Sequence, residues 1–333
     1  MTGGAGFIGS HFLRMLLSPG RGYPARLVNV DLLTYAGDLR RLGGAEADPR
    51  YRFVRADVAD AEALRAVFAE ERPQAVVHFA AESHVTRSET DPDLFHRTNV
   101  RGTAALLDAA LAAGVERFIH ISTDEVYGPI LEGSFGEEDK LAGDQQATSP
   151  YARSKALADD LARSYAGRLP VVVLRPTNAF GPWQFPEKAL ARWVSRALRG
   201  RSLPVWGDGL YVRQWLAASD LAAAVALMLQ APDPAPVYNV GVAHEPEITN
   251  LALARFVLEH LGLPESRLEM TAYDRPGHDR RYCVDGARIG GLGWRPGDVW
   301  ARLAATVDWY AANRWWWEPL VGEAESIYAG RGA

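Results

Sequence analysis

The stretch Thr2-Gly3-Gly4-Ala5-Gly6-Phe7-Ile8-Gly9-Ser10 opens the chain and decides its fold. Its glycines follow the pattern G-x-x-G-x-x-G, and the apolar residues between and after them begin a helical period. Glycines at this spacing let the backbone turn tightly and approach a pyrophosphate at a helix N-terminus. The stretch therefore predicts a dinucleotide site that includes Gly3, Gly6, Phe7, Ile8 and Gly9.

Acidic residues follow where a nucleotide site requires them. Asp31 ends the next apolar run, near the spacing of about 20 residues at which a carboxylate binds the ribose hydroxyls. A carboxylate there repels a 2'-phosphate, so the pattern predicts NAD rather than NADP. Asp57, followed by Val58, ends the third expected strand, counting the one expected before the glycine loop as the first. We expect Asp57 near the adenine. The alternative is a glycine turn followed by a solvated aspartate.

Short apolar runs alternate with amphipathic segments over the first half of the chain. Strands are expected at residues 27–30, 51–54, 75–79, 117–121 and 170–174, with helices at 61–70 and 103–113 between them. Continuous apolar runs of this length are typical of buried parallel strands. The alternation predicts an α/β fold with a doubly wound, mostly parallel sheet of the Rossmann type.

The composition and pattern of the sequence change after Pro176. Proline-rich loops, an arginine-rich helix at 188–199 and an isolated strand near 237–240 follow. We expect residues 1–175 to form an NAD-binding domain and residues 176–333 to form mainly a smaller α/β substrate domain, with a return crossing near 210–245. The run 309–320, with three consecutive tryptophans, is expected to be a helix that packs its aromatic side chains.

The glycine loop has almost nothing before it. A dinucleotide fold begins with a strand that leads into this loop, yet Met1 directly precedes Thr2. We therefore expect a truncated first strand and a native start upstream of Met1, for instance at a GTG codon. The intact mass of the native protein tests this expectation, and a native N-terminus at Met1 would contradict it.

Composition excludes several classes of protein. The chain has 333 residues, 48% hydrophobic residues and a formal net charge of −5, without a basic patch that would suit nucleic acid. The longest apolar run is far shorter than the roughly 18 residues that a membrane span needs. The only cysteine, Cys283, excludes an internal disulfide and indicates a reducing, cytoplasmic setting. We expect no metal site.

Two short motifs carry the candidate chemistry. Tyr151 precedes Lys155 by four residues, so both would lie on one face of a helix, where the ammonium lowers the pKa of the phenol and makes it a base. Thr123 is followed by Asp124 and Glu125, which could supply an acid and a second base for eliminating water beside a ketone. The alternatives are a packed tyrosine with a solvated lysine, and a capped helix N-terminus with acidic residues in its first turn.

Seven segments together resemble a known family. They are residues 3–10, 31–37 (DLLTYAG), 78–88 (HFAAESHVTRS), 122–128 (STDEVYG), 149–155 (SPYARSK), 181–188 (GPWQFPEK) and 274–282 (DRPGHDRRY). The family is that of the dTDP-glucose 4,6-dehydratases, which are extended short-chain dehydrogenases/reductases, and the resemblance covers nearly the whole chain. Related epimerases and decarboxylases of nucleotide sugars lack the Asp-Glu pair.

The resemblance implies a reaction and a set of site residues. Tyr151 would take the O4 proton of the sugar, Glu125 would remove the C5 proton and Asp124 would protonate the departing C6 hydroxyl, with Thr123 near O4. It also implies homodimers that pair through helices near 103–113 and 156–165. Further cofactor-binding residues would be Ala80, Ala81, Asn99, Tyr151 and Lys155, and substrate-binding residues would be Ser83, Asn178, Glu187, Lys188, Arg213, Asn239, Arg275, His278 and Tyr282.

The chain departs from the family pattern at four positions, and other functions stay open. Thr86 and Gln214 stand where an aspartate is expected, Ala179 replaces an asparagine, and Leu221 stands where a histidine is common. The alternative activities are a nucleotide-sugar 4-epimerase or decarboxylase. A catalytically quiet cofactor-binding protein is the alternative outside the enzymes, and each substrate-binding residue could instead form a surface ion pair.

Overall fold

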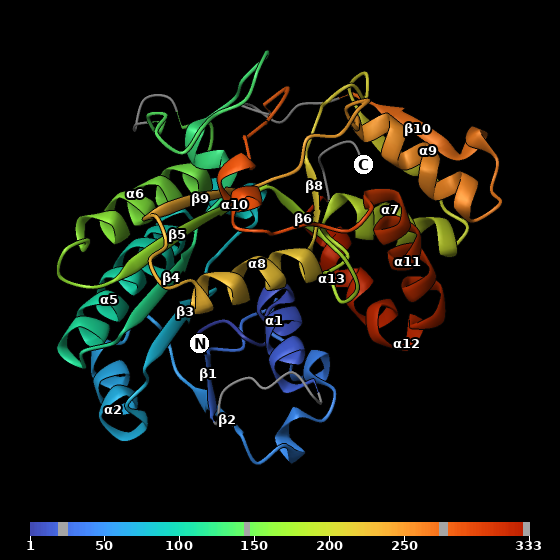
Figure 1. Ribbon diagram of the computed structural model, residues 1–333. Coiled ribbons are helices and arrows are strands. Elements are labelled where there is room, and N and C mark those ends of the chain that lie inside the picture. Colours follow the sequence, from blue (N-terminus) through green and yellow to red (C-terminus); the bar gives the residue numbers. More distant parts are fainter. Residues whose placement is uncertain (19–25, 143–146, 273–278, 329–333) are drawn as a thin grey trace.

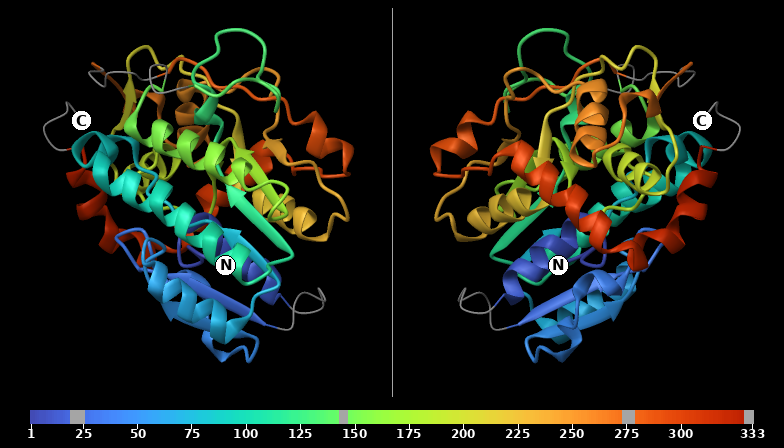
Figure 2. Two further views of the ribbon diagram at one scale, coloured as in Figure 1. Left: turned by 90° about the vertical axis from the view of Figure 1, so that its left-hand side faces the viewer. Right: turned by 90° about the vertical axis from the view of Figure 1, so that its right-hand side faces the viewer.

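A parallel sheet with helices on both faces forms the larger part of the protein (Figures 1 and 2). The computed structural model describes residues 1–18, 26–142, 147–272 and 279–328. The order across the main sheet is β2, β1, the segment at Thr2, β3, β4, β5 and β9, and all of these pairings are parallel. The predicted doubly wound α/β fold is therefore confirmed.

The strands and helices of this part have the following bounds. The strands are β1 Leu27–Asp31, β2 Tyr51–Arg55, β3 Ala75–His78, β4 Arg117–Ile121, β5 Val171–Pro176 and β9 Val237–Val240. The helices are α1 Phe7–Leu17, α2 Ala61–Glu71, α3 Val85–Thr90, α4 Pro92–Phe95, α5 Gly102–Ala112, α6 Pro150–Ser164, α8 Ala218–Gln230 and α10 Ala287–Gly291. Short helical turns are η1 Leu39–Leu42, η2 Ala45–Ala47, η3 His96–Arg101 and η4 Asp124–Tyr127.

The first residues of the chain lie in the middle of the main sheet. The N–H of Thr2 donates to the carbonyl of Val77 at 3.0 Å, and the N–H of Gly3 donates to the carbonyl of Val30 at 2.9 Å. Thr2 thus joins β1 to β3 and holds the position of the strand expected before the glycine loop.

Alternate side chains of the central strands pack against two helical layers. In β5, Val171 and Val173 contact the core beneath α2, α5 and α6, whereas Val172 and Leu174 contact the core beneath α1 and α8. Successive side chains of a strand point to opposite faces, so a strand that is covered on both sides must be apolar throughout. This explains the continuous apolar runs in the sequence.

The remaining elements form a second group around a separate core. They are β6 Asn178–Phe180, β7 Leu203–Trp206, β8 Trp215–Ala217, β10 Leu268–Thr271, α7 Ala189–Leu198, α9 Asn250–His260, η5 Glu265–Arg267, α11 Val299–Ala312, α12 Arg314–Trp317, η6 Glu318–Leu320 and α13 Val321–Ser326. Strand β7 pairs with β10 and β6 pairs with β8, all in parallel. Trp316 and Trp317 are fully buried here, as expected, whereas Trp315 is 57% exposed.

Helix α6 is fixed to the main sheet by a buried ion pair. Arg175 of β5 donates from Nη2 to Oδ1 of Asp159 at 2.7 Å, and both side chains are fully buried. The same guanidinium donates from Nη1 to the hydroxyl of Tyr127 at 2.6 Å. Loss of one partner from such a pair costs about 3–5 kcal/mol. The network therefore holds α6 in place relative to η4, and these two elements carry the candidate catalytic side chains.

No helix within the described residues is long and apolar enough to cross a membrane.

Candidate active site

The glycine loop forms a cradle at the start of α1. Gly3 has a φ of +71°, and a Cβ on it would lie 2.5 Å from the backbone nitrogen of Ala80. Gly6 caps α1 without a side chain, which leaves the first N–H groups of the helix available to an anion. Gly3 and Gly6 line a cavity at this point, whereas Ile8 packs into the core and a Cβ on Gly9 would clash with Gly3. The chain thus offers the backbone geometry that a dinucleotide needs.

Two expected acidic residues lie on the wall of the same cavity. The carboxylate of Asp31 accepts hydrogen bonds from the N–H groups of Ala5 and Leu33, at 2.9 and 2.8 Å. These bonds fix the orientation of the carboxylate, and its remaining lone pairs are free to accept ribose hydroxyls. Asp57 also lines the cavity and forms an ion pair with Arg97.

The other expected cofactor residues fall into two groups. Val58, Ala80 and Ala81 line the cavity, whereas Phe7 and Asn99 do not. Asn99 is buried and joins two segments, because its side-chain amide bonds the backbone of Glu82 in both directions and donates to Oγ of Ser154 at 2.9 Å. Asn99 therefore holds the cavity wall against α6.

The turn η4 brings two carboxyl groups together. Oγ1 of Thr123 accepts a hydrogen bond from the N–H of Glu125 and donates to Oδ1 of Asp124 at 3.1 Å. Asp124 is 3% exposed, and its Oδ2 has no hydrogen-bond partner among the described residues. Burial and the neighbouring Glu125 raise the pKa of Asp124 to about 7. Asp124 can therefore hold a proton near neutral pH, as a general acid must.

Helix α6 brings Tyr151 to this pair. Oγ of Ser149 caps the helix by accepting from the N–H of Ala152 at 3.1 Å, and Pro150 takes the first helical position, where a proline fits. Tyr151 therefore sits in the first turn, where its hydroxyl bonds Thr123 and its ring lies in the electrostatic field of both carboxyl groups. The structure places Thr123, Asp124, Glu125 and Tyr151 in one cluster.

The expected lowering of the Tyr151 pKa needs correction. Burial, followed by the charges of Glu125 and Asp124, raises the pKa of Tyr151 above its ordinary value. Lys155 is 3% exposed, and its ammonium donates to the carbonyl of Ile121 at 2.6 Å. Burial lowers the pKa of Lys155 to about 8. Sequence spacing places the two side chains on one helix, but desolvation dominates the ionisation of the phenol.

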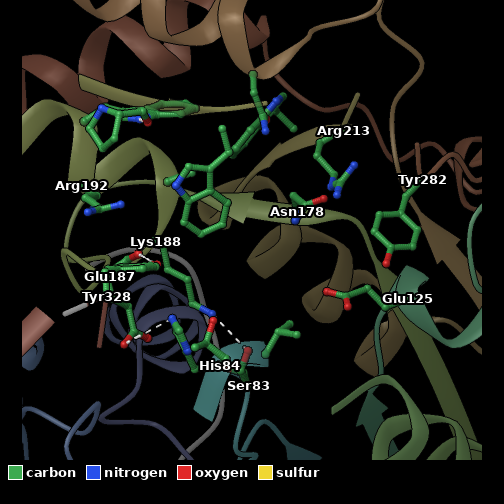
Figure 3. A pocket seen from close by; sticks show the side chains of 18 residues that line it. Ser83, His84, Glu125, Asn178, Glu187, Lys188, Arg192, Arg213, Tyr282 and Tyr328 are labelled. Carbon is green, nitrogen blue, oxygen red and sulfur yellow. Dashed lines mark hydrogen bonds and ion pairs between the residues drawn. The ribbon is translucent and has the colours of Figure 1, made fainter. Parts of the chain in front are cut away.

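A large cavity begins at this cluster (Figure 3). It has about 1020 Å³ of empty space, open to solvent at its mouth. Glu125 and Tyr282 lie close together on one side, and Arg192, Glu187 and Tyr328 lie on the opposite side. Besides Glu125, the lining includes six residues expected to bind substrate, namely Ser83, Asn178, Glu187, Lys188, Arg213 and Tyr282.

Hydrogen bonds hold several of these side chains at the cavity. Nζ of Lys188 donates to the carbonyl of Ser83 at 3.1 Å. The guanidinium of Arg213 donates to the carbonyls of Val212 and Asp279, at 2.7 and 2.8 Å. Oδ1 of Asn178 is buried and has no hydrogen-bond partner within the described residues, so it can accept from a ligand.

Asn239 lies elsewhere, which corrects its expected position. Its side chain is fully buried in β9, accepts from the hydroxyl of Tyr127 at 2.8 Å and donates to the carbonyl of Phe135 at 3.0 Å. These partners occupy the amide, and Asn239 does not line the cavity. Arg275 and His278, also expected to bind substrate, lie outside the described residues.

The dinucleotide cradle and the polar cavity are thus neighbours, since Glu82 lines the first and Ser83 lines the second, and Glu125 of the Thr-Asp-Glu-Tyr cluster also lines the polar cavity. The profile of the family described as "NAD dependent epimerase/dehydratase family" matches residues 1–241. This chain belongs to that family.

Similar members of the epimerase/dehydratase family extend the match over nearly the whole chain. The dTDP-glucose 4,6-dehydratase of Actinoplanes sp. is 47% identical, over 95% of this chain and 98% of the relative. That of Streptomyces antibioticus is 46% identical, over 96% and 94%. The crystal structure of DesIV, a dTDP-glucose 4,6-dehydratase from Streptomyces venezuelae with NAD bound, has a TM-score of 0.89 and 45% identity, and covers 96% of this chain and 98% of its own.

Several lining residues of this family member were not predicted from the sequence. The second group of elements contributes Arg192, Trp206, Asn250 and Tyr328. They come from α7, β7, α9 and the segment after α13, which are far apart in the sequence. The string Leu203-Pro204-Val205-Trp206-Gly207 could have signalled a strand end that carries an aromatic side chain, but nothing local identifies the other three.

Gly3→Ala is expected to weaken both NAD binding and folding. An alanine at a left-handed φ costs about 1–2 kcal/mol, and here the new Cβ would also meet the backbone of Ala80 at 2.5 Å. Chemical denaturation and an NAD titration measure the two effects.

Gly114→Ala is the matched control for this variant. Gly114 has a φ of +67°, and a Cβ there would meet nothing within 4 Å. Gly3→Ala should therefore destabilise the protein more than Gly114→Ala, and only Gly3→Ala should weaken NAD binding. Equal effects of the two substitutions would contradict a close approach at Gly3.

Proposed function

We propose that this protein is an NAD-dependent dTDP-glucose 4,6-dehydratase, which converts dTDP-glucose to dTDP-4-keto-6-deoxyglucose and water. The observation that carries the proposal is the buried Asp124 beside Glu125, in hydrogen-bond and electrostatic contact with Thr123 and Tyr151. Relatives with this activity, at 46–47% identity over nearly their full length, support it. An epimerase needs no acid and base for C5 and C6.

The residues of the chain divide the proton transfers among them. The chemistry that NAD supplies when bound is acceptance of a hydride from C4, a positive charge that favours the Tyr151 phenolate, and return of the hydride to C6. Tyr151 takes the O4 proton, and Thr123 holds that hydroxyl in place. The resulting 4-ketone makes the C5 proton acidic enough for a carboxylate to remove it.

Elimination then uses the two carboxyl groups differently. Glu125 faces the cavity and takes the C5 proton, while Asp124, with its pKa raised to about 7, protonates the C6 hydroxyl so that it leaves as water. Two neighbouring carboxyl groups in different environments can serve as base and acid at the same pH. The overall reaction consumes no outside oxidant, since the hydride that leaves C4 arrives at C6. Glu125 returns a proton to C5 at that step, and the proton taken from O4 replaces the one that Asp124 gives to the departing water.

Direct turnover tests this proposal. The protein is incubated with NAD and dTDP-glucose, and the ultraviolet absorbance of the product in alkali is recorded. A new absorbance band of the 4-keto-6-deoxy sugar is expected. Recovery of a 4-epimer, or of unchanged substrate, would contradict the proposal, and UDP-glucose as substrate tests the choice of nucleotide.

The role of Asp124 predicts the pH dependence of kcat/KM, which reports the free enzyme. The acid form of Asp124 is the active one, and it disappears as the pH rises through about 7. The value of kcat/KM for dTDP-glucose should therefore fall on the alkaline side of pH 7. Asp124→Asn cannot titrate, so it should be slower and should lack this alkaline limb. A limb that persists in Asp124→Asn would contradict the assignment.

Asp31 supports NAD over NADP. Its carboxylate is held in the cofactor cavity by two backbone N–H groups, where it would repel a 2'-phosphate.

The organisation of the molecule is also part of the proposal. We assign NAD binding to residues 1–175, together with the return at α8 and β9, and substrate binding mainly to residues 176–333. We further propose a cytoplasmic homodimer that pairs through α5 and α6, where Leu157 is 38% exposed. A monomeric mass by light scattering would contradict the dimer.

A further inference from the structure

Arg192 of α7 is a buried cation with unused hydrogen-bond donors at the substrate cavity. The residue is 4% exposed and lines the cavity, where Figure 3 shows it on the side opposite Glu125. Its Nε and Nη2 have no hydrogen-bond partner among the described residues. A buried donor without a partner is costly, so the site is complete only when an acceptor arrives.

The carboxylates nearby contact groups other than Arg192, although Oε2 of Glu187 has no hydrogen-bond partner within the described residues. Glu325 forms an ion pair with Arg196, at 2.9 Å. Oε1 of Glu187 accepts from the hydroxyl of Tyr35 at 3.1 Å, and its Oε2 lies 3.9 Å from Nε2 of His84. Arg192 forms no ion pair with a carboxylate of the described residues, and burial lowers its pKa without removing its charge. Within the described part of the chain nothing accepts from its Nε and Nη2, and a ligand in the cavity can supply the acceptor.

The surroundings of Arg192 suit a flat ring rather than a diphosphate. The guanidinium lies over the ring of Tyr328, 4.0 Å from the ring centre. Tyr328 packs edge-on against Trp206, with 5.7 Å between ring centres, and its hydroxyl donates to the carbonyl of Glu187 at 2.6 Å. Pro204 and Trp193 also line the cavity. Aromatic and apolar walls favour a nucleobase, and the carboxylate of Glu187 disfavours a second anion.

We propose that Arg192 reads the nucleobase of the substrate and selects a base with carbonyl acceptors, such as thymine, over cytosine. Thymine presents the O4 acceptor where cytosine presents an N4 amino donor, and a guanidinium can only donate. The inference rests on the proposed function, because it assumes a nucleotide sugar in this cavity with its sugar at Glu125. The forked donors of arginine would make Arg192 a specificity residue that takes no part in the chemistry.

The free nucleotides dTDP and dCDP test this role by calorimetric titration. The wild type should bind dTDP more tightly than dCDP. Arg192→Leu should lose about tenfold to a hundredfold in affinity for dTDP and much less for dCDP, so the preference should nearly vanish. Arg192→Lys keeps the charge and loses the forked donors, so its preference for dTDP over dCDP should lie between those of the wild type and Arg192→Leu. With dTDP-glucose, Arg192→Leu should raise KM and leave kcat within a few fold of wild type.

Arg199→Leu is the matched control, because Arg199 ends the same helix and is exposed. It should bind both nucleotides as the wild type does. An equal loss for dTDP and dCDP in Arg192→Leu would indicate phosphate binding or a structural role, and it would overturn the inference. An unchanged preference for dTDP over dCDP would also overturn the inference. If Arg192→Leu fails to fold, the titrations of Arg192→Lys test the role of Arg192 instead.

These outcomes are distinct from failure of the proposed function. A wild type that turns over dTDP-glucose, with base preference unaltered in the Arg192 variants, would overturn the inference alone. A wild type that does not turn over dTDP-glucose would overturn the proposed function, and the titrations would still decide the role of Arg192.

Discussion

Tyr151→Phe is expected to lower kcat for dTDP-glucose by about a hundredfold to ten-thousandfold, which corresponds to about 3–5 kcal/mol in the barrier. The hydroxyl of Tyr151 is the group that takes the O4 proton, because it bonds Thr123, whereas the hydroxyl of Tyr282, which lies near Glu125, donates to Asp279. The first step should therefore fail. Mixing the variant with NAD and dTDP-glucose in a stopped-flow instrument should give no rise in NADH absorbance.

Tyr165→Phe is the control for this result. Tyr165 follows the same helix at its other end, and its hydroxyl donates to Asp108 at 2.5 Å. This variant loses a tyrosine hydroxyl without touching the cluster, so its turnover should match the wild type. Titrations with NAD and dTDP should show that Tyr151→Phe still binds both. A burst of NADH absorbance in Tyr151→Phe would show that another group removes the proton.

The fold could be predicted from the sequence where burial leaves a periodic signal. Strands β4 and β5 contact helices on both faces, so the sequence needs apolar residues at successive positions, and such runs are visible. The helix boundaries of the C-terminal part were harder to predict. The helix expected over 309–320 is broken at Asn313, which has a φ of −121° and a ψ of 42°, between α11 and α12. A run of tryptophans predicts burial but does not locate a helix end.

Ionisation in the site could not be predicted from spacing alone. The four-residue interval between Tyr151 and Lys155 places both on α6, and the interval alone suggested a lowered phenol pKa. In the structure, both side chains are buried and Lys155 donates to the carbonyl of Ile121. Desolvation opposes the charged form of each group, so the pKa of Tyr151 is raised and that of Lys155 is lowered.

The substrate cavity depends on contacts between distant segments. Asn239 lies in β9, one residue before the strand ends, but its side chain bonds Tyr127 and Phe135 instead of facing the cavity. Arg192 and Tyr328 are separated by over a hundred residues and meet at the cavity. No local pattern encodes such a meeting, because it depends on how the second core packs.

Glu125→Gln is expected to separate oxidation from elimination. The amide cannot accept the C5 proton, whereas Tyr151 and Asp124 remain to support oxidation at C4. Single-turnover mixing with dTDP-glucose should therefore show NADH absorbance that rises and then persists, while formation of the 4-keto-6-deoxy product falls by about a hundredfold or more. In the wild type, the absorbance should be transient.

Asp124→Asn is the companion variant, because it removes the acid and leaves the C5 base. Both variants should stall after oxidation, but they should differ when turnover is run in deuterium oxide. Recovered substrate should exchange its C5 proton with Asp124→Asn and should not with Glu125→Gln, as mass spectrometry can measure. Exchange at C5 in Glu125→Gln, or rapid normal turnover, would place the base elsewhere. Because Glu125 lines the cavity and the buried Asp124 has the raised pKa of an acid, the geometry favours Glu125 as the carboxylate that meets C5.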